Sequence, residues 1–138
     1  MTNDLNFITN SLFDKVTYDG SADNWHFSFA DKIGISVSGF WRLLEKNHIV
    51  LVSLDHGHKF GLTEPLDLKE EIKNRLTAKK IIKIVVNKDT ADLILTFTDQ
   101  FKLEIYIASS NYETYDFSIN NKRYIGLGSG SIAIMEIV

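Results

Sequence analysis

The sequence predicts an α+β protein, mainly antiparallel β in a curved sheet or a sandwich, with one central helix near residues 66–78. Three observations lead to this prediction. Many short stretches carry apolar residues two apart, which lines one face of an extended chain. Most of the pattern of residues 15–37 returns without a gap at residues 83–105. Between them, a single segment carries apolar residues at helical spacing.

The two stretches repeat a pattern of positions more than a set of identical residues. Each predicts a strand, a polar loop, a second strand and a hairpin return. Three aligned pairs are identical: Lys15/Lys83, Phe29/Phe97 and Asp31/Asp99. In the other matching pairs both residues are apolar: Val16/Ile84, Tyr18/Val86, Trp25/Leu93, Phe27/Leu95, Ile33/Phe101, Ile35/Leu103 and Val37/Ile105. We therefore predict two pseudo-repeated halves, about residues 14–55 and 82–138, within a single domain of residues 1–138.

The same pattern predicts the hairpin turns. A three-residue loop places Phe29 opposite Ile33, whereas a two-residue loop would put the two apolar sets on opposite faces of the sheet. The loops are then residues 30–32 and 98–100. A left-handed conformation is expected at their last position, which Lys32 and Gln100 occupy although Gly or Asn is usual.

The remaining elements of the first half follow from local spacing. Leu5, Ile8 and Leu12 stand at helical spacing, so the first dozen residues are expected to form a short amphipathic helix. Residues 40–44 and 48–54 have the composition of strands, and the segment that follows them reads as an irregular loop.

The central helix has the clearest signals of any element. Asp67 can cap its start, and Leu68, Ile72 and Leu76 form an apolar stripe one turn apart. Further strands are expected at residues 114–119, 123–127 and 132–137. The glycines of residues 126–130 predict a tight turn and not a phosphate loop, because a strand follows them where a phosphate loop requires a helix.

Composition is that of an ordinary soluble globular protein. Hydrophobic residues make up 44% and charged residues 24% of the 138 residues. The chain has no cysteine, so its stability must come from the core. The start lacks a basic region, and no apolar run reaches the roughly 18 residues of a membrane span. We expect a cytoplasmic protein without a membrane association.

Charge is unevenly distributed along the chain. The net charge is −3, and acidic residues prevail in the two repeated stretches while basic residues prevail between them. Asp31 and Asp99 recur at equivalent loop positions. This pattern disfavours nucleic acid as a ligand and permits a basic partner, although solvated loop tips are the simpler explanation because Asp is a preferred loop residue.

The tetrapeptide of residues 55–58 is the segment that most suggests a metal site or a catalytic site, because it contains Asp55, His56 and His58. Two imidazoles and a carboxylate within four residues could supply ligands to zinc or another divalent ion, or a general base to a hydrolase. A metal site normally needs a further ligand, and a hydrophilic loop without any function can have the same residues. We therefore expect no metal, no cofactor and no catalytic residue.

Two clusters combine aromatic and charged residues. Trp41 and Arg42 follow the first hairpin, and Tyr112, Glu113 and Tyr115 follow the second. Trp, Tyr and Arg are the residues that most often dominate protein interfaces. These residues are candidates for partner binding, together with the two loop aspartates. The alternative is a structural seam between the halves, with an arginine and a glutamate paired there.

The two clusters and the glycine-rich turn before the last strand resemble small uncharacterised bacterial proteins of the immunity type, which are encoded beside secreted or contact-dependent toxins. Tyr115 stands where that pattern has a tryptophan, and Gly128-Ser129-Gly130 replaces a glycine pair. The resemblance implies that the chain binds and neutralises a toxin, commonly a nuclease.

The expected function is therefore non-catalytic binding of a toxin. One alternative is a small metal-dependent or histidine-based hydrolase that uses Asp55, His56 and His58. Another is a structural or oligomer-forming protein, in which residues 132–138 form an edge strand.

Overall fold

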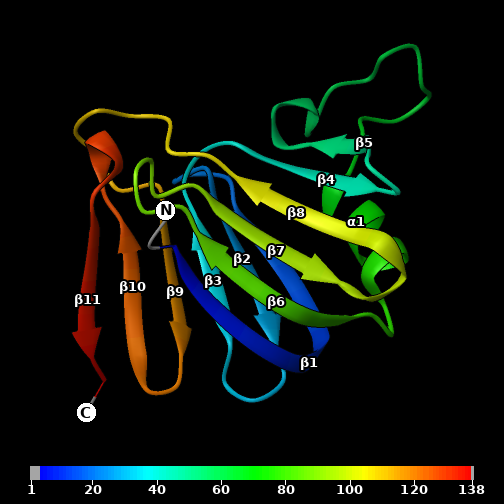
Figure 1. Cartoon of the computed structure of the whole chain (residues 1–138). Coiled ribbons are helices and arrows are strands. Elements are labelled where there is room, and N and C mark those ends of the chain that lie inside the picture. The colour runs from blue at the N-terminus through cyan, green and yellow to red at the C-terminus, as the bar shows by residue number, and fades with distance from the viewer. Residues whose placement is uncertain (1–3, 138) are drawn as a thin grey trace.

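The structure is a computed structural model that describes residues 4–137 (Figure 1). In chain order its elements are β1 (Leu5–Asp19), β2 (Asn24–Phe29), β3 (Gly34–Val37), β4 (Trp41–Glu45), β5 (His48–Val52), the 3-10 helix η1 (Ser53–Asp55), α1 (Leu68–Leu76), β6 (Lys80–Val86), β7 (Leu93–Phe97), η2 (Thr98–Gln100), β8 (Phe101–Ile105), β9 (Tyr115–Ile119), β10 (Lys122–Gly126), η3 (Gly128–Gly130) and β11 (Ile132–Glu136). A mostly antiparallel sheet with one α-helix agrees with the predicted α+β class.

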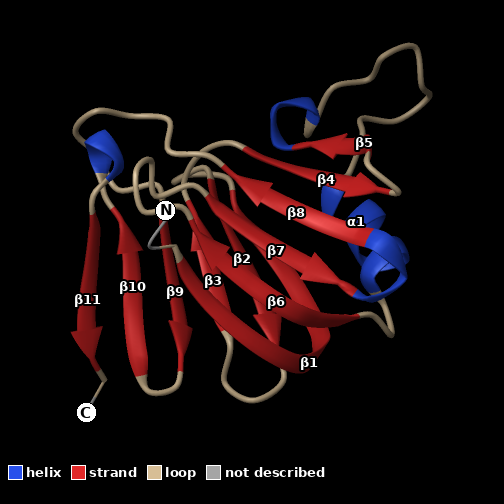
Figure 2. Ribbon diagram, in the orientation of Figure 1, coloured by secondary structure: helices blue, strands red, loops and turns tan. Residues whose placement is uncertain are grey.

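The strands form one 11-stranded sheet in the order β11-β10-β9-β3-β2-β1-β6-β7-β8-β4-β5. The long strand β1 belongs to both parts of it, because residues 5–12 pair with β6 and residues 13–19 pair with β2. We call the strands on one side the β2 wing (β2, β3, β9, β10 and β11) and those on the other the β6 wing (β6, β7, β8, β4 and β5). The two edge strands do not pair, so the sheet is folded but not closed (Figure 2).

The prediction of an N-terminal helix is wrong, because residues 5–19 form β1. Side chains of Leu5, Phe7 and Phe13 point inward at even spacing, and Ile8, on the opposite face, is 80% exposed. The period of two, continued by the polar Thr9 and Ser11, overrides the helical spacing. Thr9 Oγ1 donates to the Ile81 carbonyl at 2.6 Å, which ties this part of β1 to the strand beside it.

The two predicted hairpins form with the predicted three-residue loops. Trp25 lies opposite Val37 in the β2–β3 hairpin, and Leu93 lies opposite Ile105 in the β7–β8 hairpin. Each loop places two consecutive residues at positive φ. These are Asp31 and Lys32 at 62° and 60°, and Asp99 and Gln100 at 59° and 66°. The left-handed conformation expected at the last loop position is confirmed at both sites.

Helix α1 has the N-cap and the buried residues that the sequence predicts. The Asp67 side chain accepts from the Lys69 N–H at 3.0 Å, and Leu68, Ile72 and Leu76 are buried. Each such burial stabilises the fold by about 1.5–3 kcal/mol. The longest helix of residues 4–137 is α1 with nine residues, too short to cross a bilayer.

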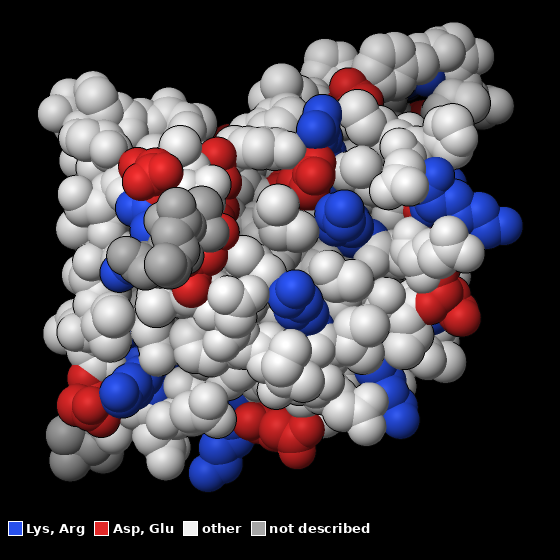
Figure 3. All heavy atoms as spheres, in the orientation of Figure 1, with Lys and Arg blue, Asp and Glu red and all other residues white. Residues whose placement is uncertain are grey.

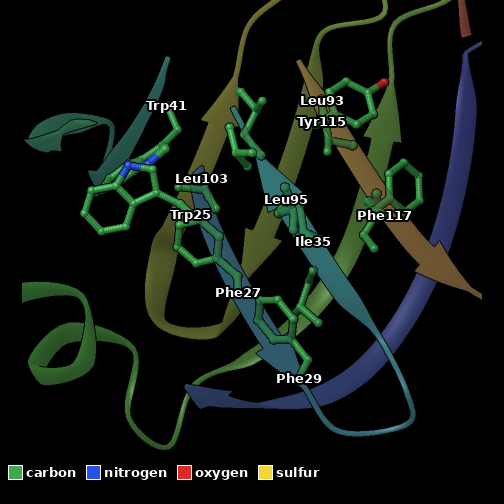
Figure 4. Close-up of a cluster of buried hydrophobic side chains, with 14 of the residues drawn as sticks. Trp25, Phe27, Phe29, Ile35, Trp41, Leu93, Leu95, Leu103, Tyr115 and Phe117 are labelled. Carbon is green, nitrogen blue, oxygen red and sulfur yellow. The ribbon is translucent and has the colours of Figure 1, made fainter. Parts of the chain in front are cut away.

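The core lies between the facing surfaces of the two wings. Phe29 of β2 meets Phe97 of β7 with ring centroids 5.9 Å apart. Trp41 of β4 makes an edge contact with Trp25 of β2 at 5.2 Å (Figure 4). Because each contact joins one wing to the other, the folding of the sheet at β1 is what creates the core.

Candidate functional site

Trp41 and Tyr115, two of the predicted partner-binding residues, are core residues. Trp41 is 0% exposed and packs its indole edge-to-face against the rings of Trp25 and Phe27. The Tyr115 hydroxyl donates to the Ala91 carbonyl at 2.8 Å, and burial raises the pKa of Tyr115 far above its ordinary value of 10.0. Neither side chain is available to a rigid partner, so their assignment as interface anchors is corrected to structural roles.

Arg42 pairs across the wing with a residue that the sequence did not single out. Its Nε lies 2.6 Å from Glu104 Oε1, and its Nη2 donates to the Tyr106 hydroxyl at 3.1 Å. The carboxylate raises the pKa of Arg42 above its usual range. Pairing of β4 with β8 brings these residues together. The expected pairing of an arginine with a glutamate does occur, but the glutamate is Glu104 of β8 and not Glu113.

The two loop aspartates lie far from the aromatic clusters along the strands. Asp31 accepts from Ser11 Oγ at 2.7 Å, and Asp99 pairs with Lys79 Nζ at 2.5 Å. Both turns lie at the end of the sheet opposite to the β8–β9 loop that carries Tyr112 (Figure 1). The predicted partner-binding residues therefore do not form one surface.

His56 is engaged in packing and in holding α1. Its Nδ1 accepts from the Leu68 N–H at 3.2 Å, and its ring contacts the rings of Tyr18 and Trp25. His58 stacks on the exposed Phe60 ring instead. Within residues 4–137, no group of three His, Cys, Asp or Glu residues is arranged to hold a metal ion.

Hydrogen bonds tie three loops into one polar surface. We call it the loop platform: residues 87–92 between β6 and β7, residues 107–114 between β8 and β9, and residues 127–131 between β10 and β11. Ser129 ties two of the loops, because its N–H donates to the Ser109 carbonyl at 3.1 Å and its Oγ to the Ser110 carbonyl at 2.8 Å. Asp92 Oδ1 accepts from the Ile107 N–H at 2.9 Å and ties the third.

Close approach of the backbone explains two of the glycines here. A Cβ at Gly128 would lie 2.4 Å from Asn111 N, and one at Gly130 would lie 2.9 Å from the Thr90 carbonyl oxygen. Gly130 also has a φ of +87°. These contacts let the glycine-rich turn lie directly against the other two loops, which restricts the conformation of the platform.

Tyr112 projects from the platform with 77% of its surface exposed. Its N–H donates to Ser109 Oγ at 3.0 Å, which fixes the backbone that carries it. Asp89 and Asp92 line a hollow of about 490 Å³ between the three loops. Figure 3 shows acidic side chains gathered at the end of the sheet where the β6–β7 loop lies. Glu113 is exposed on the same loop. The hydrogen bond and charge of Asp116 raise the pKa of Arg123, and the charge of Glu113 adds to that rise.

The sequence indicated part of this platform only. It placed Tyr112 and Glu113 after the second hairpin and predicted a tight turn at the glycines of residues 126–130, but it did not bring the two together. It did not bring residues 87–92 to the same place, because that contact depends on the fold of the whole sheet. The signal that could have indicated this contact is the spacing of the glycines, because a glycine often marks the close approach of another backbone segment.

Comparison of this chain with models of protein families, with curated protein sequences and with solved structures finds no match. The assignment of a function therefore depends on the geometry described above and on the resemblance noted in the sequence.

Proposed function

We propose that the chain is a non-catalytic binding protein of the immunity type, which acts in the cytoplasm and neutralises a toxin through the loop platform. The observation that carries the proposal is Tyr112. It is a large amphipathic side chain, 77% exposed, on a surface whose three loops are tied by hydrogen bonds. Tyrosine is among the residues that most often supply binding energy at interfaces.

Preorganisation supports the same proposal. A surface that is already ordered loses little conformational entropy when a partner binds, so more of the contact energy remains as affinity. Ties from Ser129, Asp92 and Tyr115 to neighbouring loops order the platform before binding. In this proposal Tyr112 serves as the anchor, and Asp89 and Glu113 contribute carboxylates to the same platform.

Charge favours a basic partner at this site. A nuclease must present a cationic surface to hold nucleic acid, and an acidic platform can cover that surface with fast, salt-sensitive association. Of the partner-binding residues named from sequence, Tyr112 and Glu113 remain in this role. Asp31 and Asp99 are exposed too, but they lie at the other end of the sheet.

The experiment is co-expression with the product of the adjacent upstream gene. If that product is toxic alone, the proposal predicts that the chain restores growth and co-purifies with it. Tyr112→Ala should reduce protection, while Phe60→Ala, a change of an exposed aromatic on another loop, should leave it intact. Failure of the intact chain to bind or protect would refute the proposal.

A second candidate function is self-association through the edge strand β11. Ile134 and Met135 are half exposed on β11, which pairs with β10 on one side only among the described strands. Apolar residues on an unpaired strand edge favour pairing with another chain. Sedimentation of the purified chain tests this candidate, with Met135→Lys as the variant that should abolish any dimer.

We also propose that the two halves are a structural pseudo-repeat. The pairings Val16–Phe27 and Phe27–Ile35 in the first half correspond to Ile84–Leu95 and Leu95–Leu103 in the second. The strand order supports the proposal, because it can be read outward from the β1–β6 pair with β2, β3, β9 and β10 on one side and β7, β8, β4 and β5 on the other. An experimental structure superposed on itself in this correspondence is the test.

A further inference from the structure

The second half of β1 has one side without a strand partner. Residues 13–19 pair with β2, and β6 pairs only with residues 5–12. The last tie on the β6 side is the hydrogen bond from the Phe13 N–H to the Lys79 carbonyl, at 2.9 Å. Beyond it, no strand of residues 4–137 pairs with this side of β1.

Alternation within the sheet identifies the unpaired groups. The Phe29 N–H donates to the Ile33 carbonyl at 2.9 Å. Backbone groups alternate in direction along a strand, so Phe29, Phe27 and Trp25 of β2 point their N–H and C=O groups toward β3. The residues between them point toward β1 and pair with Lys15, Thr17 and Asp19. The N–H and C=O groups of Val16 and Tyr18 therefore point away from β2.

A groove lies along this unpaired side. It has a volume of about 620 Å³, and it is lined by residues 14–18 of β1 and by Lys69, Glu70, Lys73 and Thr77 of α1 and its C-cap. Five extended residues span about 17 Å. One wall of the groove is thus a strand edge, and the other is the polar face of a helix. The length of the strand edge fits a short extended peptide.

Charge indicates which peptide would bind there. Three lysines line the groove, Lys15 on the strand with Lys69 and Lys73 on the helix, against the two carboxylates of Asp14 and Glu70. In a chain whose net charge is −3, the lining carries an excess of positive charge. An acidic peptide would meet amines from both walls, whereas a basic peptide would meet like charge from both.

We propose that this groove binds an extended acidic segment of a partner protein by β-strand addition to Val16 and Tyr18. Backbone hydrogen bonds to those two residues supply the register. Every second side chain of the bound segment lies over Val16 and Tyr18, which are half buried against the core, and the others lie beside Lys15 in solvent. The site uses residues outside the loop platform, so this proposal can be tested independently of the toxin-binding proposal.

The test is NMR titration of the ¹⁵N-labelled chain with a capped hexapeptide of alternating glutamate and valine. Binding should shift the Val16 and Tyr18 amide signals and slow their hydrogen exchange at least tenfold. Two control peptides separate the causes. The same peptide with N-methyl groups on alternate amides should bind at least tenfold more weakly, and so should the lysine–valine hexapeptide.

Matched variants locate the site on the protein. Lys15→Glu combined with Lys73→Glu should weaken binding at least tenfold, whereas Lys59→Glu, on the exposed loop before α1, should not. Val16→Pro removes only an N–H that faces the groove, so it should fold and lose the peptide. Thr17→Pro removes an N–H that pairs with β2 and should destabilise the sheet.

Several results would overturn the proposal. These are the absence of any shift at millimolar acidic peptide, equal binding of the lysine–valine peptide, or shifts confined to the edge strands β5 and β11. A dimer that forms without peptide and is abolished by Val16→Pro would also overturn it, because a second copy of the chain would then occupy the groove.

Discussion

The contact between Phe29 and Phe97 gives the sharpest test of how the two wings pack. Both rings are buried, and their centroids are 5.9 Å apart with an interplanar angle of 32°. Truncation of either residue to alanine removes a buried ring and leaves a cavity, so each change should lower the free energy of unfolding by about 3–5 kcal/mol. The exposed Phe60 provides the matched control, for which a change to alanine should cost less than about 0.5 kcal/mol.

A double-mutant cycle then measures the contact itself. Phe29→Leu and Phe97→Leu keep the sites filled, and each should cost no more than about 1.5 kcal/mol. If the rings interact across the wings, the double mutant should depart from the sum of the single mutants by about 0.5–1.5 kcal/mol. Urea unfolding followed by tryptophan fluorescence is the assay. Alanine costs below about 1 kcal/mol at both sites, or a coupling of zero, would refute the packing of the wings.

Three further predictions concern individual side chains. Because burial raises the pKa of Tyr115 above 10.0, the unfolded chain loses this proton first as pH rises, and stability should fall above pH 10 with a contribution of about 1.4 kcal/mol per pH unit. Alkaline unfolding of Tyr115→Phe should lack that contribution, and an unchanged slope would contradict the assignment. His56→Ala should cost about 1–2 kcal/mol in urea unfolding, because it leaves the Leu68 N–H without its acceptor, whereas His58→Ala should cost under about 0.5 kcal/mol. Equal effects of the two changes would mean that His56 does not hold α1. Gly128→Ala should disorder the platform loops, because its Cβ would lie 2.4 Å from Asn111 N, and faster amide exchange at residues 109–112 is the readout. Unchanged exchange there would show that the loops do not depend on this approach.

Local patterns predicted the hairpins because the physical cause is local. Alternation in residues 25–29 and 33–37 sets both the buried face and the length of the loop between them. Helix α1 was predicted for the same reason, since Asp67 and the stripe from Leu68 to Leu76 lie within one short segment. The positive φ of Lys32 and Gln100 could be predicted from the register of the paired strands, although neither residue type usually adopts a positive φ.

The N-terminal strand could not be predicted because two periods compete there. Leu5, Ile8 and Leu12 suggest a helix, while the inward face of the strand includes Thr9 and Ser11, whose polarity hides the alternation. Ser11 is buried and donates to Asp31, so a long-range hydrogen bond makes the polar position tolerable. The sequence offers no local sign of that partner.

The role of the aromatic clusters depended on long-range pairing. β4 crosses to pair with β8, and β9 crosses to pair with β3. These crossings carry Trp41 and Tyr115 into the core and leave Tyr112 in solvent. Residue type alone cannot separate a tyrosine that anchors a partner from one that fills a core, because both uses require the same large amphipathic side chain.

The proposed function requires that the loop platform bind a protein partner through Tyr112. Its most direct test is the dissociation constant between the chain and the product of the adjacent upstream gene, measured by titration calorimetry. We predict a measurable complex whose affinity falls at least 30-fold in Tyr112→Ala, about 2 kcal/mol, and stays within threefold in Phe60→Ala. An affinity that Tyr112→Ala leaves unchanged, or no binding to a product shown to be toxic, would contradict the account.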